Sequence, residues 1–442
     1  MRRVYLPLQT SIRGVRRRIQ PPLPIKTLEE TIDDRIKAST SLDAFGPMRN
    51  IRGKPASWLS DATTYADKNA AIFDPASELP YNPEDMEPVS RKQREEKLLR
   101  QKQKLSVKKR IGRISMSHIP IEEQVVILFP GQGSQHVGMG SKVVDHKPSM
   151  QLFERASEVL GYDLYELCKN GPKTKLDQTI YCQPAIFVSS LAAFEKLKDE
   201  ENLEGRITDV AGFSVGEIAA LVVAGVLRFD DALRLVKLRA EAMHECNQLV
   251  PSGMITIRIS AASRLDDALN DAREAAVEAG ERPLCEVANY LVQGVRVIGA
   301  SNLCIDFLVK NADRYKIQVK QRIPVSGAFH TSLMEEAGQK LYFALKKEKF
   351  VTFEKPHLNV FSNYSGGLYK TKPTEMKKLL IKQVSEPVKW EQIQQGLFHR
   401  KKKVDGEEIY PTYIEVGPGK QLGAMLYLVS KKMHRRYRNY PC

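Results

Sequence analysis

Five consecutive large apolar residues, Val125-Val126-Ile127-Leu128-Phe129, are followed at once by Pro130-Gly131. A strand with this composition has no polar face that could turn toward water, so both of its faces must be buried. Strands of this kind lie in the centre of parallel sheets that helices cover on both sides. The run therefore predicts a layered α/β fold with a glycine-containing turn at the carboxyl end of this strand.

Strand and helix patterns alternate after this run. Amphipathic spacing predicts helices over Met150–Tyr165 and Pro184–Leu197. Ile207–Ala211 is typical of a second buried strand, an apolar helix is expected over Glu217–Val226, and a later strand over Leu358–Phe361. Alternation of this kind favours a mostly parallel sheet, so we expect an α/β-hydrolase-like core.

The segment 252–325 follows a different order of elements. Its pattern predicts strand, helix, strand, strand, helix and strand, which is the βαββαβ order of ferredoxin-like folds. We therefore expect a small ferredoxin-like subdomain over 252–325, inserted into a large subdomain that is formed by 121–251 and 326–430.

The first 28 residues contain seven Arg and Lys residues, and the first acidic residue is Glu29. Apolar residues are interspersed among the arginines and do not form a continuous core. This composition is typical of a mitochondrial transit peptide and not of a secretory signal. We therefore predict a transit peptide over 1–28 and a location in the mitochondrial matrix; the alternative is an RNA-binding or disordered tail.

Much of the formal net charge of +15 lies near the N-terminus, because residues 1–120 carry 24 Lys and Arg against 14 Asp and Glu. Residues 29–120 are poor in core-type residues, and the charged run 91–113 predicts a polar helix without a wide apolar stripe. We interpret 29–120 as a basic extension of unknown role. We do not expect the protein to bind nucleic acid, except through this basic extension.

The six cysteines are scattered and form no CxxC pair, which favours free thiols in a reducing compartment and no metal site. No apolar run approaches the roughly 18 residues of a membrane span, so none is expected.

A serine flanked by glycines, Gly212-Phe213-Ser214-Val215-Gly216, lies between a predicted strand and a predicted helix. Glycines at these positions let two backbones pass closely around a sharp turn. The turn would place the serine hydroxyl at a helix N-terminus, where oriented N–H groups favour a developing oxyanion. The pattern alone is short enough to arise by chance, and its context favours a nucleophile.

Three further motifs follow strand-like segments. They are Phe129–Gln135 (FPGQGSQ), Val325–Met334 (VSGAFHTSLM) and Glu415–Leu422 (EVGPGKQL). The first is no dinucleotide loop, because the third glycine of GxGxxG would fall at His136. It can instead lend a backbone N–H to an oxyanion hole, or be only a tight turn. His330 in the second motif is a candidate base, although a lone histidine is more often structural.

In this order and separation, the four motifs resemble the malonyl-CoA:acyl carrier protein transacylase family and the related acyltransferase domains of fatty acid and polyketide synthases. The resemblance covers about residues 124–430, and Leu235–Met243 resembles the arginine-bearing helix of the family. It implies transfer of a malonyl group from malonyl-CoA to the phosphopantetheine thiol of an acyl carrier protein, for type II fatty acid synthesis. The implied partners are this carrier and the coenzyme A thioester, with no bound cofactor.

The resemblance also implies roles for individual residues. Ser214 would be the nucleophile and His330 its general base. The backbone N–H groups of Gln132 and Val215 would form the oxyanion hole. A backbone carbonyl in the region of Gln383 would orient the histidine, because the motifs offer no acidic third member of a triad.

Arg239 is implied to bind the free carboxylate of the malonyl group, which a guanidinium fork suits. An alternative role for Arg239 is an ion pair on the helix surface, for example with Glu245. Phe213, where bacterial relatives carry histidine, is typical of mitochondrial members. Phe329 matches members that select malonyl over methylmalonyl groups, and both phenylalanines are implied to line the substrate pocket.

One departure from the family pattern occurs at Asn289-Tyr290-Leu291-Val292-Gln293, where an Asn-Ser-Pro-like turn is common, so Asn289 need not make the equivalent contact. Two alternatives of function are open at this point. One is a serine thioesterase or other hydrolase, which shares GxSxG. The other is a binding protein that acts through its basic N-terminal block.

Overall fold

The structure, a computed structural model, describes residues 114–116, 118–347, 350–404 and 406–442, all within the unit Pro55–Cys442. The predicted transit peptide (1–28), the predicted polar helix (91–113) and almost all of the predicted extension (29–120) lie outside these residues. No helix of the described part is both long and apolar enough to cross a membrane.

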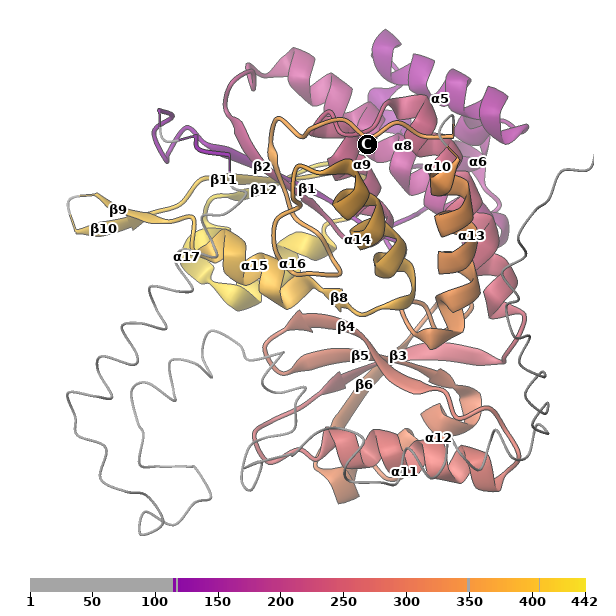
Figure 1. Ribbon diagram of the computed structural model, residues 1–442. Helices are drawn as coiled ribbons and strands as arrows, with labels where there is room; N and C mark the ends of the chain where they lie inside the picture. Colours follow the sequence, from indigo (N-terminus) through magenta and orange to yellow (C-terminus); the bar gives the residue numbers. More distant parts are fainter. Residues whose placement is uncertain (1–113, 117, 348–349, 405) are drawn as a thin grey trace, which may run out of the picture. The chain divides into compact units, whose positions relative to one another are not determined.

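The larger of the two regions is built on a five-stranded sheet of order β12-β11-β1-β2-β7, in which every neighbouring pair is parallel (Figure 1). The apolar run predicted as a central strand is β1. The mostly parallel α/β core is therefore confirmed. The strands are β1 (Val125–Phe129), β2 (Ile207–Gly212), β7 (Asn359–Val360), β11 (Thr412–Val416) and β12 (Tyr437–Tyr440).

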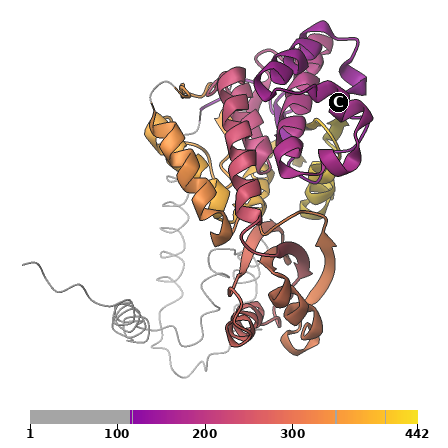
Figure 2. The same cartoon turned by 90° about the vertical axis from the view of Figure 1, so that its right-hand side faces the viewer.

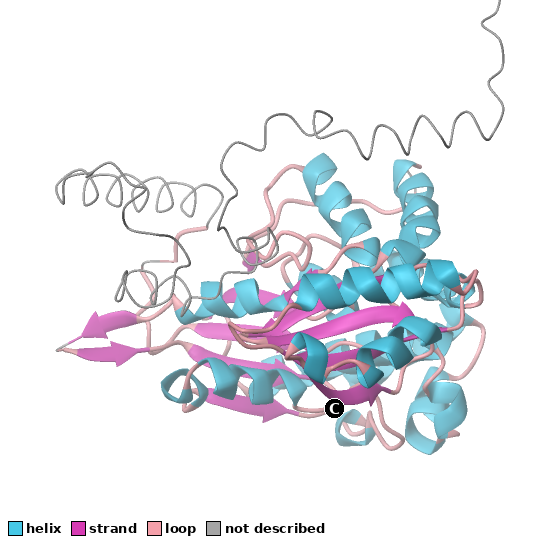
Figure 3. Ribbon diagram, turned by 90° about the horizontal axis from the view of Figure 1, so that it is seen from below, coloured by secondary structure: helices cyan, strands magenta, loops and turns pink. Residues whose placement is uncertain are grey.

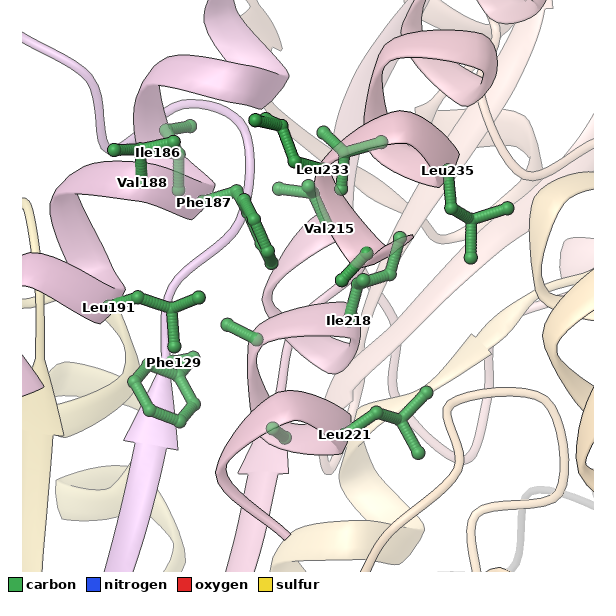
Figure 4. Packing of buried hydrophobic residues seen from close by; sticks show 14 of the residues in the cluster. Phe129, Ile186, Phe187, Val188, Leu191, Val215, Ile218, Leu221, Leu233 and Leu235 are labelled. Atoms are coloured by element: carbon green, nitrogen blue, oxygen red, sulfur yellow. The ribbon is translucent and has the colours of Figure 1, made fainter. Parts of the chain in front are cut away.

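The two faces of β1 belong to two different hydrophobic clusters. Val125, Ile127 and Phe129 lie in the main core, with residues of helices α5, α8, α9 and α10. Val126 and Leu128 lie in a second cluster, with residues of α15 and α16. Since alternate residues of a strand point to opposite faces, this arrangement explains why the run has no polar position. Figure 3 shows helices on both sides of the strands, and Figure 4 shows the main core around Phe129.

Helices of the larger region mostly follow the predicted periodicity, with one difference. The helix predicted over Met150–Tyr165 is divided in two, because Gly161 takes a left-handed conformation (φ 82°) that ends the first helix. The Asp163 side chain then caps the second by accepting the backbone N–H of Glu166. The helices are α5 (Lys147–Leu160), α6 (Leu164–Asn170), α7 (Lys173–Leu176), α8 (Thr179–Glu200), α9 (Val215–Val223), α10 (Phe229–Asn247), α13 (Glu335–Lys346), α14 (Pro373–Ser385), α15 (Trp390–Phe398), α16 (Gln421–Val429) and α17 (Lys431–His434).

The second sheet has the order β6-β3-β5-β4-β8, and its first four strands are antiparallel neighbours. Helices α11 and α12 pack on one face of it (Figure 1). The chain order βαββαβ and this strand order confirm the predicted ferredoxin-like fold. The elements are β3 (Ser252–Arg258), α11 (Leu265–Glu278), β4 (Cys285–Val292), β5 (Val295–Ser301), α12 (Asn302–Lys310) and β6 (Gln318–Ile323).

The two sheets are joined in ways that the sequence pattern does not reveal. Strand β8 (Val388–Lys389), which follows α14, pairs in parallel with β4 and adds a fifth strand to the second sheet. Met254 and Val297 point away from α11 and α12 and lie in the main core. Helices α10, α13 and α14 stand side by side in Figure 2. The chain also continues past residue 430, the expected end of the large subdomain, into α17 and the edge strand β12.

Candidate active site

Ser214 lies in the turn between β2 and α9 with φ 53° and ψ −109°. Only three non-glycine residues of the described chain have positive φ: Ser214, Lys316 and His330. A backbone conformation of this kind is unfavourable for a residue with a Cβ and persists only where its surroundings enforce it. Two of the three strained positions are therefore the predicted nucleophile and the predicted base.

Glycines permit the close backbone approaches around this turn. A Cβ at Gly212 would lie 1.9 Å from the Gly216 carbonyl oxygen, and one at Gly216 would lie 2.4 Å from that of Phe129. A Cβ at Gly131 would lie 2.5 Å from the Phe213 carbonyl oxygen. The glycine-rich turn after β1 and the serine turn after β2 can thus touch, because β1 and β2 are parallel neighbours whose carboxyl ends meet.

His330 lies in the irregular segment between β6 and α13, not directly at the strand end as its motif suggested. Its Nε2 is 2.8 Å from Ser214 Oγ, and its Nδ1 is 2.8 Å from the backbone oxygen of Gln383. A carbonyl oxygen can only accept, so Nδ1 carries the proton and Nε2 of the neutral ring is the acceptor. This tautomer can take the proton of the serine hydroxyl.

Arg239 lies on α10 and is only 1% exposed. Its Nη2 donates to Ser214 Oγ (3.0 Å) and to Gln383 Oε1 (3.0 Å), and its Nη1 donates to Gln183 Oε1 (2.6 Å). The Nε–H group is buried and has no hydrogen-bond partner within the described chain. The alternative of an ion pair with Glu245 is wrong, because that carboxylate pairs with Lys340.

Burial governs the protonation of these groups. It lowers the pKa of His330 to about 3, with a smaller contribution of the same sign from the Arg239 charge. Burial also lowers the pKa of Arg239 to about 10, so the guanidinium stays charged near neutral pH. The site in its resting form thus holds a neutral imidazole and a buried cation next to one hydroxyl group.

The predicted oxyanion donors lie on the two turns that touch. Val215 is the first residue of α9, so its N–H has no carbonyl partner within the helix. Gln132 follows β1 in the turn held against Phe213, and its side chain donates to Thr179 Oγ1 (3.4 Å). A carbonyl oxygen above Ser214 would therefore face the amino end of α9, where negative charge is favoured.

The two predicted pocket phenylalanines differ in their surroundings. The Phe213 ring packs edge-on against Trp390 with 5.4 Å between centroids. Phe329 is 5% exposed and belongs to the main core. Asn289 lies on β4 opposite Val388 of β8, is 4% exposed, and its Nδ2 has no partner among the described residues.

Sequence reasoning missed two residues that hold the serine turn. The Asn363 side chain accepts the Ser214 N–H (2.7 Å) and donates to the Gly212 carbonyl (2.7 Å). Glu217, one turn into α9, is fully buried and accepts the backbone N–H of Asn363 (3.1 Å). A charged residue within an apolar helix and an asparagine just after a predicted strand were the available signals.

A serine on a strained strand-to-helix turn, with a neutral imidazole and a buried guanidinium against its hydroxyl, defines an acyl-transfer site of the serine class. Residues 126–427 match the family model described as the acyl transferase domain. The chain therefore belongs to the acyl transferase domain family, and the resemblance inferred from its motifs is confirmed.

Similar proteins with established names agree with this membership. The chain is 45% identical over 314 residues to the human mitochondrial malonyl-CoA-acyl carrier protein transacylase, covering 71% of this chain and 78% of that protein. It is 44% identical over 323 residues to the mouse protein of the same name, covering 72% and 82%. A solved malonyl-transacylase in complex with its type II PKS acyl-carrier protein matches with a TM-score of 0.60 at 26% identity, over 72% of this chain and 96% of that chain.

Proposed function

We propose that this protein is an acyl carrier protein S-malonyltransferase, which moves the malonyl group of malonyl-CoA to the phosphopantetheine thiol of an acyl carrier protein. The proposal rests on one observation above all. Ser214 Oγ is within hydrogen-bond distance of both His330 Nε2 (2.8 Å) and Arg239 Nη2 (3.0 Å). A base and a cation thus meet at one nucleophile, as acyl transfer of an anionic group requires.

In the first step, Ser214 Oγ attacks the thioester carbonyl carbon while its proton passes to His330 Nε2. The negative charge that develops on the carbonyl oxygen faces the N–H groups of Gln132 and Val215. The carbon–sulfur bond then breaks, and the departing coenzyme A thiolate takes the proton from the imidazolium. The product is a malonyl ester on Ser214.

In the second step, the thiol of the carrier protein gives its proton to His330 and attacks the ester carbonyl. The bond between that carbon and Ser214 Oγ breaks, and the oxygen recovers the proton. The backbone carbonyl of Gln383 supports both steps, since it accepts the Nδ1–H of His330. It thereby keeps Nε2 of the same ring available as an acceptor and then as a donor. Both steps exchange an acyl group between oxygen and sulfur, so the proposed route uses no bound cofactor.

Arg239 is the proposed ligand of the malonyl carboxylate. Its Nε–H has no partner in the described part of the chain, and one N–H of the neighbouring Nη2 donates to Ser214 Oγ. Once that oxygen is acylated, this N–H and the Nε–H can serve the two carboxylate oxygens together. An acetyl group would leave this buried charge without an anion, which disfavours acetyl transfer. Phe213 and Phe329 are the proposed apolar contacts of the acyl group.

The decisive experiment is mass spectrometry after incubation with malonyl-CoA. We expect one malonyl group on the peptide that contains Ser214, its loss on addition of the phosphopantetheinyl carrier protein, and a malonylated carrier. A Ser214→Ala variant should form no adduct, whereas Ser260→Ala, at an exposed serine of the small subdomain, should behave as wild type. An adduct that persists in Ser214→Ala would refute the nucleophile assignment.

The same experiment separates transfer from hydrolysis. A thioesterase would release malonate at the same rate with and without the carrier protein, and no malonylated carrier would form. The proposed location is the mitochondrial matrix, supported by the arginine-rich start of the chain and by the names of the human and mouse relatives. Imaging of the full chain fused to a fluorescent protein tests it, and a cytosolic signal would contradict it.

A further inference from the structure

Glu217 is a fully buried carboxylate that the proposed steps do not use. It lies three residues after Ser214 on α9 and makes no direct ion pair within the described chain. Three donors converge on it instead: the Tyr369 hydroxyl, the Asn363 backbone N–H (3.1 Å) and Gln383 Nε2 (3.0 Å). A carboxylate is suited to this place because it only accepts hydrogen bonds.

The Gln383 side chain connects this carboxylate to the substrate-binding cation. Its Nε2 donates to Glu217 Oε2 (3.0 Å) and to the Ser214 carbonyl (2.7 Å), while its Oε1 accepts from Arg239 Nη2 (3.0 Å). Rotating the amide by 180° would turn its oxygen toward two acceptors and its NH₂ toward a cation. Glu217 and the Ser214 carbonyl thus hold the amide in the one orientation that presents an acceptor to Arg239, and Glu217 is the side chain of this pair.

We propose that Glu217 is a positioning residue for malonyl specificity, which orients the Gln383 amide and through it aims the Arg239 guanidinium at the acyl group on Ser214. This role rests on the proposed function and adds a residue that acts without touching the substrate. The NH₂ group of the Gln383 amide is held by a hydrogen-bond acceptor of Glu217. The proposed role of Glu217 therefore requires an acceptor oxygen at this position more than it requires a negative charge.

The charge of Glu217 is a separate matter from its capacity to accept. Burial raises the pKa of Glu217 to about 7, against the lowering effect of its three donors and of Arg239. The ionisable groups that act on it are the Tyr369 hydroxyl and the Arg239 guanidinium. A protonated Glu217 still offers a carbonyl oxygen to Gln383, so the positioning survives neutralisation.

Three variants separate the acceptor from the charge. Glu217→Gln keeps an acceptor oxygen at the same reach and removes the charge, because Tyr369 can turn its hydroxyl to accept from the new NH₂ group. Glu217→Asp keeps the charge and withdraws the acceptor by one methylene. Glu217→Met removes the acceptor and keeps the volume. Asp209→Asn is the matched control, since Asp209 is a buried carboxylate on β2 that pairs with Arg400 (3.0 Å).

The readout is the ratio of kcat/KM for malonyl and acetyl thioesters, measured per titrated active site. We expect this ratio to fall by about tenfold or more in Glu217→Met, as for loss of one hydrogen bond to a charged group, and by several-fold in Glu217→Asp. Glu217→Gln should stay within about threefold of wild type, because it retains the acceptor. A purely structural role would lower the melting temperature and the active fraction without changing the ratio, as expected for Asp209→Asn.

If Glu217→Met does not fold, the contrast between Glu217→Asp and Glu217→Gln decides the matter. A lower malonyl-to-acetyl ratio in Glu217→Asp than in Glu217→Gln supports the positioning role. A lower ratio in Glu217→Gln, or equal ratios in all folded variants, overturns it. Absence of a malonyl ester on wild-type Ser214 would overturn the proposed function itself. A normal wild-type ester with unchanged ratios in the variants would overturn only the role of Glu217.

Discussion

Replacing Arg239 with alanine should change which acyl group the protein prefers. The guanidinium donates to Ser214 Oγ, Gln183 Oε1 and Gln383 Oε1 and is 1% exposed. In Arg239→Ala a malonyl carboxylate would enter a buried site without its cation. An acetyl group has no charge to be matched, so its transfer should be affected much less.

The magnitude follows from what the carboxylate loses. Removing one partner of a buried ion pair typically costs about 3–5 kcal/mol. Because each 1.36 kcal/mol is a factor of ten in rate, kcat/KM for the malonyl thioester should fall on the order of 10²- to 10⁴-fold. Arg239→Lys keeps a positive charge but loses the planar fork, so an intermediate loss of about tenfold is expected.

The assay is kcat/KM for malonyl and acetyl thioesters with one carrier protein, normalised to the number of titratable active sites. Arg234→Ala is the matched control, because Arg234 lies on the same helix, is exposed and pairs with Asp231. This control should leave the malonyl-to-acetyl ratio at the wild-type value.

An unchanged ratio in a folded Arg239→Ala variant would refute the reasoning, since it would mean that the carboxylate is bound elsewhere. An equal fall for both thioesters would also count against it. That result would assign Arg239 to the serine hydroxyl alone, to which it donates at 3.0 Å.

Three further outcomes are expected. Asn363→Ala should lower kcat by about 10²-fold at nearly constant KM in steady-state kinetics, because the Ser214 N–H and the Gly212 carbonyl of the strained turn lose their buried partners. An unchanged kcat would contradict this prediction. Gly212→Ala should lower the free energy of unfolding by about 3 kcal/mol or more in urea titrations, since its Cβ would lie 1.9 Å from a backbone oxygen of α9, and a loss below ~1 kcal/mol would argue against this contact. The profile of kcat/KM against pH should show no loss of rate on the acid side with a midpoint near pH 6.5. Burial holds the pKa of His330 near 3, so the imidazole is neutral at any higher pH. This profile is best measured with the Glu217→Gln variant and a malonyl thioester of N-acetylcysteamine, since neither the variant side chain nor the phosphate-free substrate titrates in this range. A loss of rate on the acid side with a midpoint near pH 6.5 would show that the imidazole is solvated.

Local residue patterns were enough to predict the elements that form the serine turn. The unbroken apolar run of β1 implied burial on two faces, and its alternate residues do lie in two different clusters. The glycines at 212 and 216 implied a crossing of backbones, which their contacts show. These features depend on neighbours within a few residues, so the chain reveals them without coordinates. The division of the helix at Gly161 was missed because one glycine is tolerated in many helices.

Pairing and burial depend on residues that are far apart in the chain. Strand β8 has two residues and no pattern of its own, yet its pairing with β4 joins the segment that follows α14 to the second sheet. Gln383 lies 169 positions from Ser214, and it contacts the serine carbonyl, Glu217, His330 and Arg239 at once.

The family resemblance could name Ser214, His330 and Arg239 from their motifs, because each stands within a recognisable run of residues. It could not tell that the imidazole is neutral, that the guanidinium forms no direct ion pair within the described residues, or that Glu217 holds the amide between them. Those properties come from the removal of water around groups that helices α9, α10 and α14 bring together. A residue's charge and its partner are set by what surrounds it in space, and that surrounding exists only once the chain has folded.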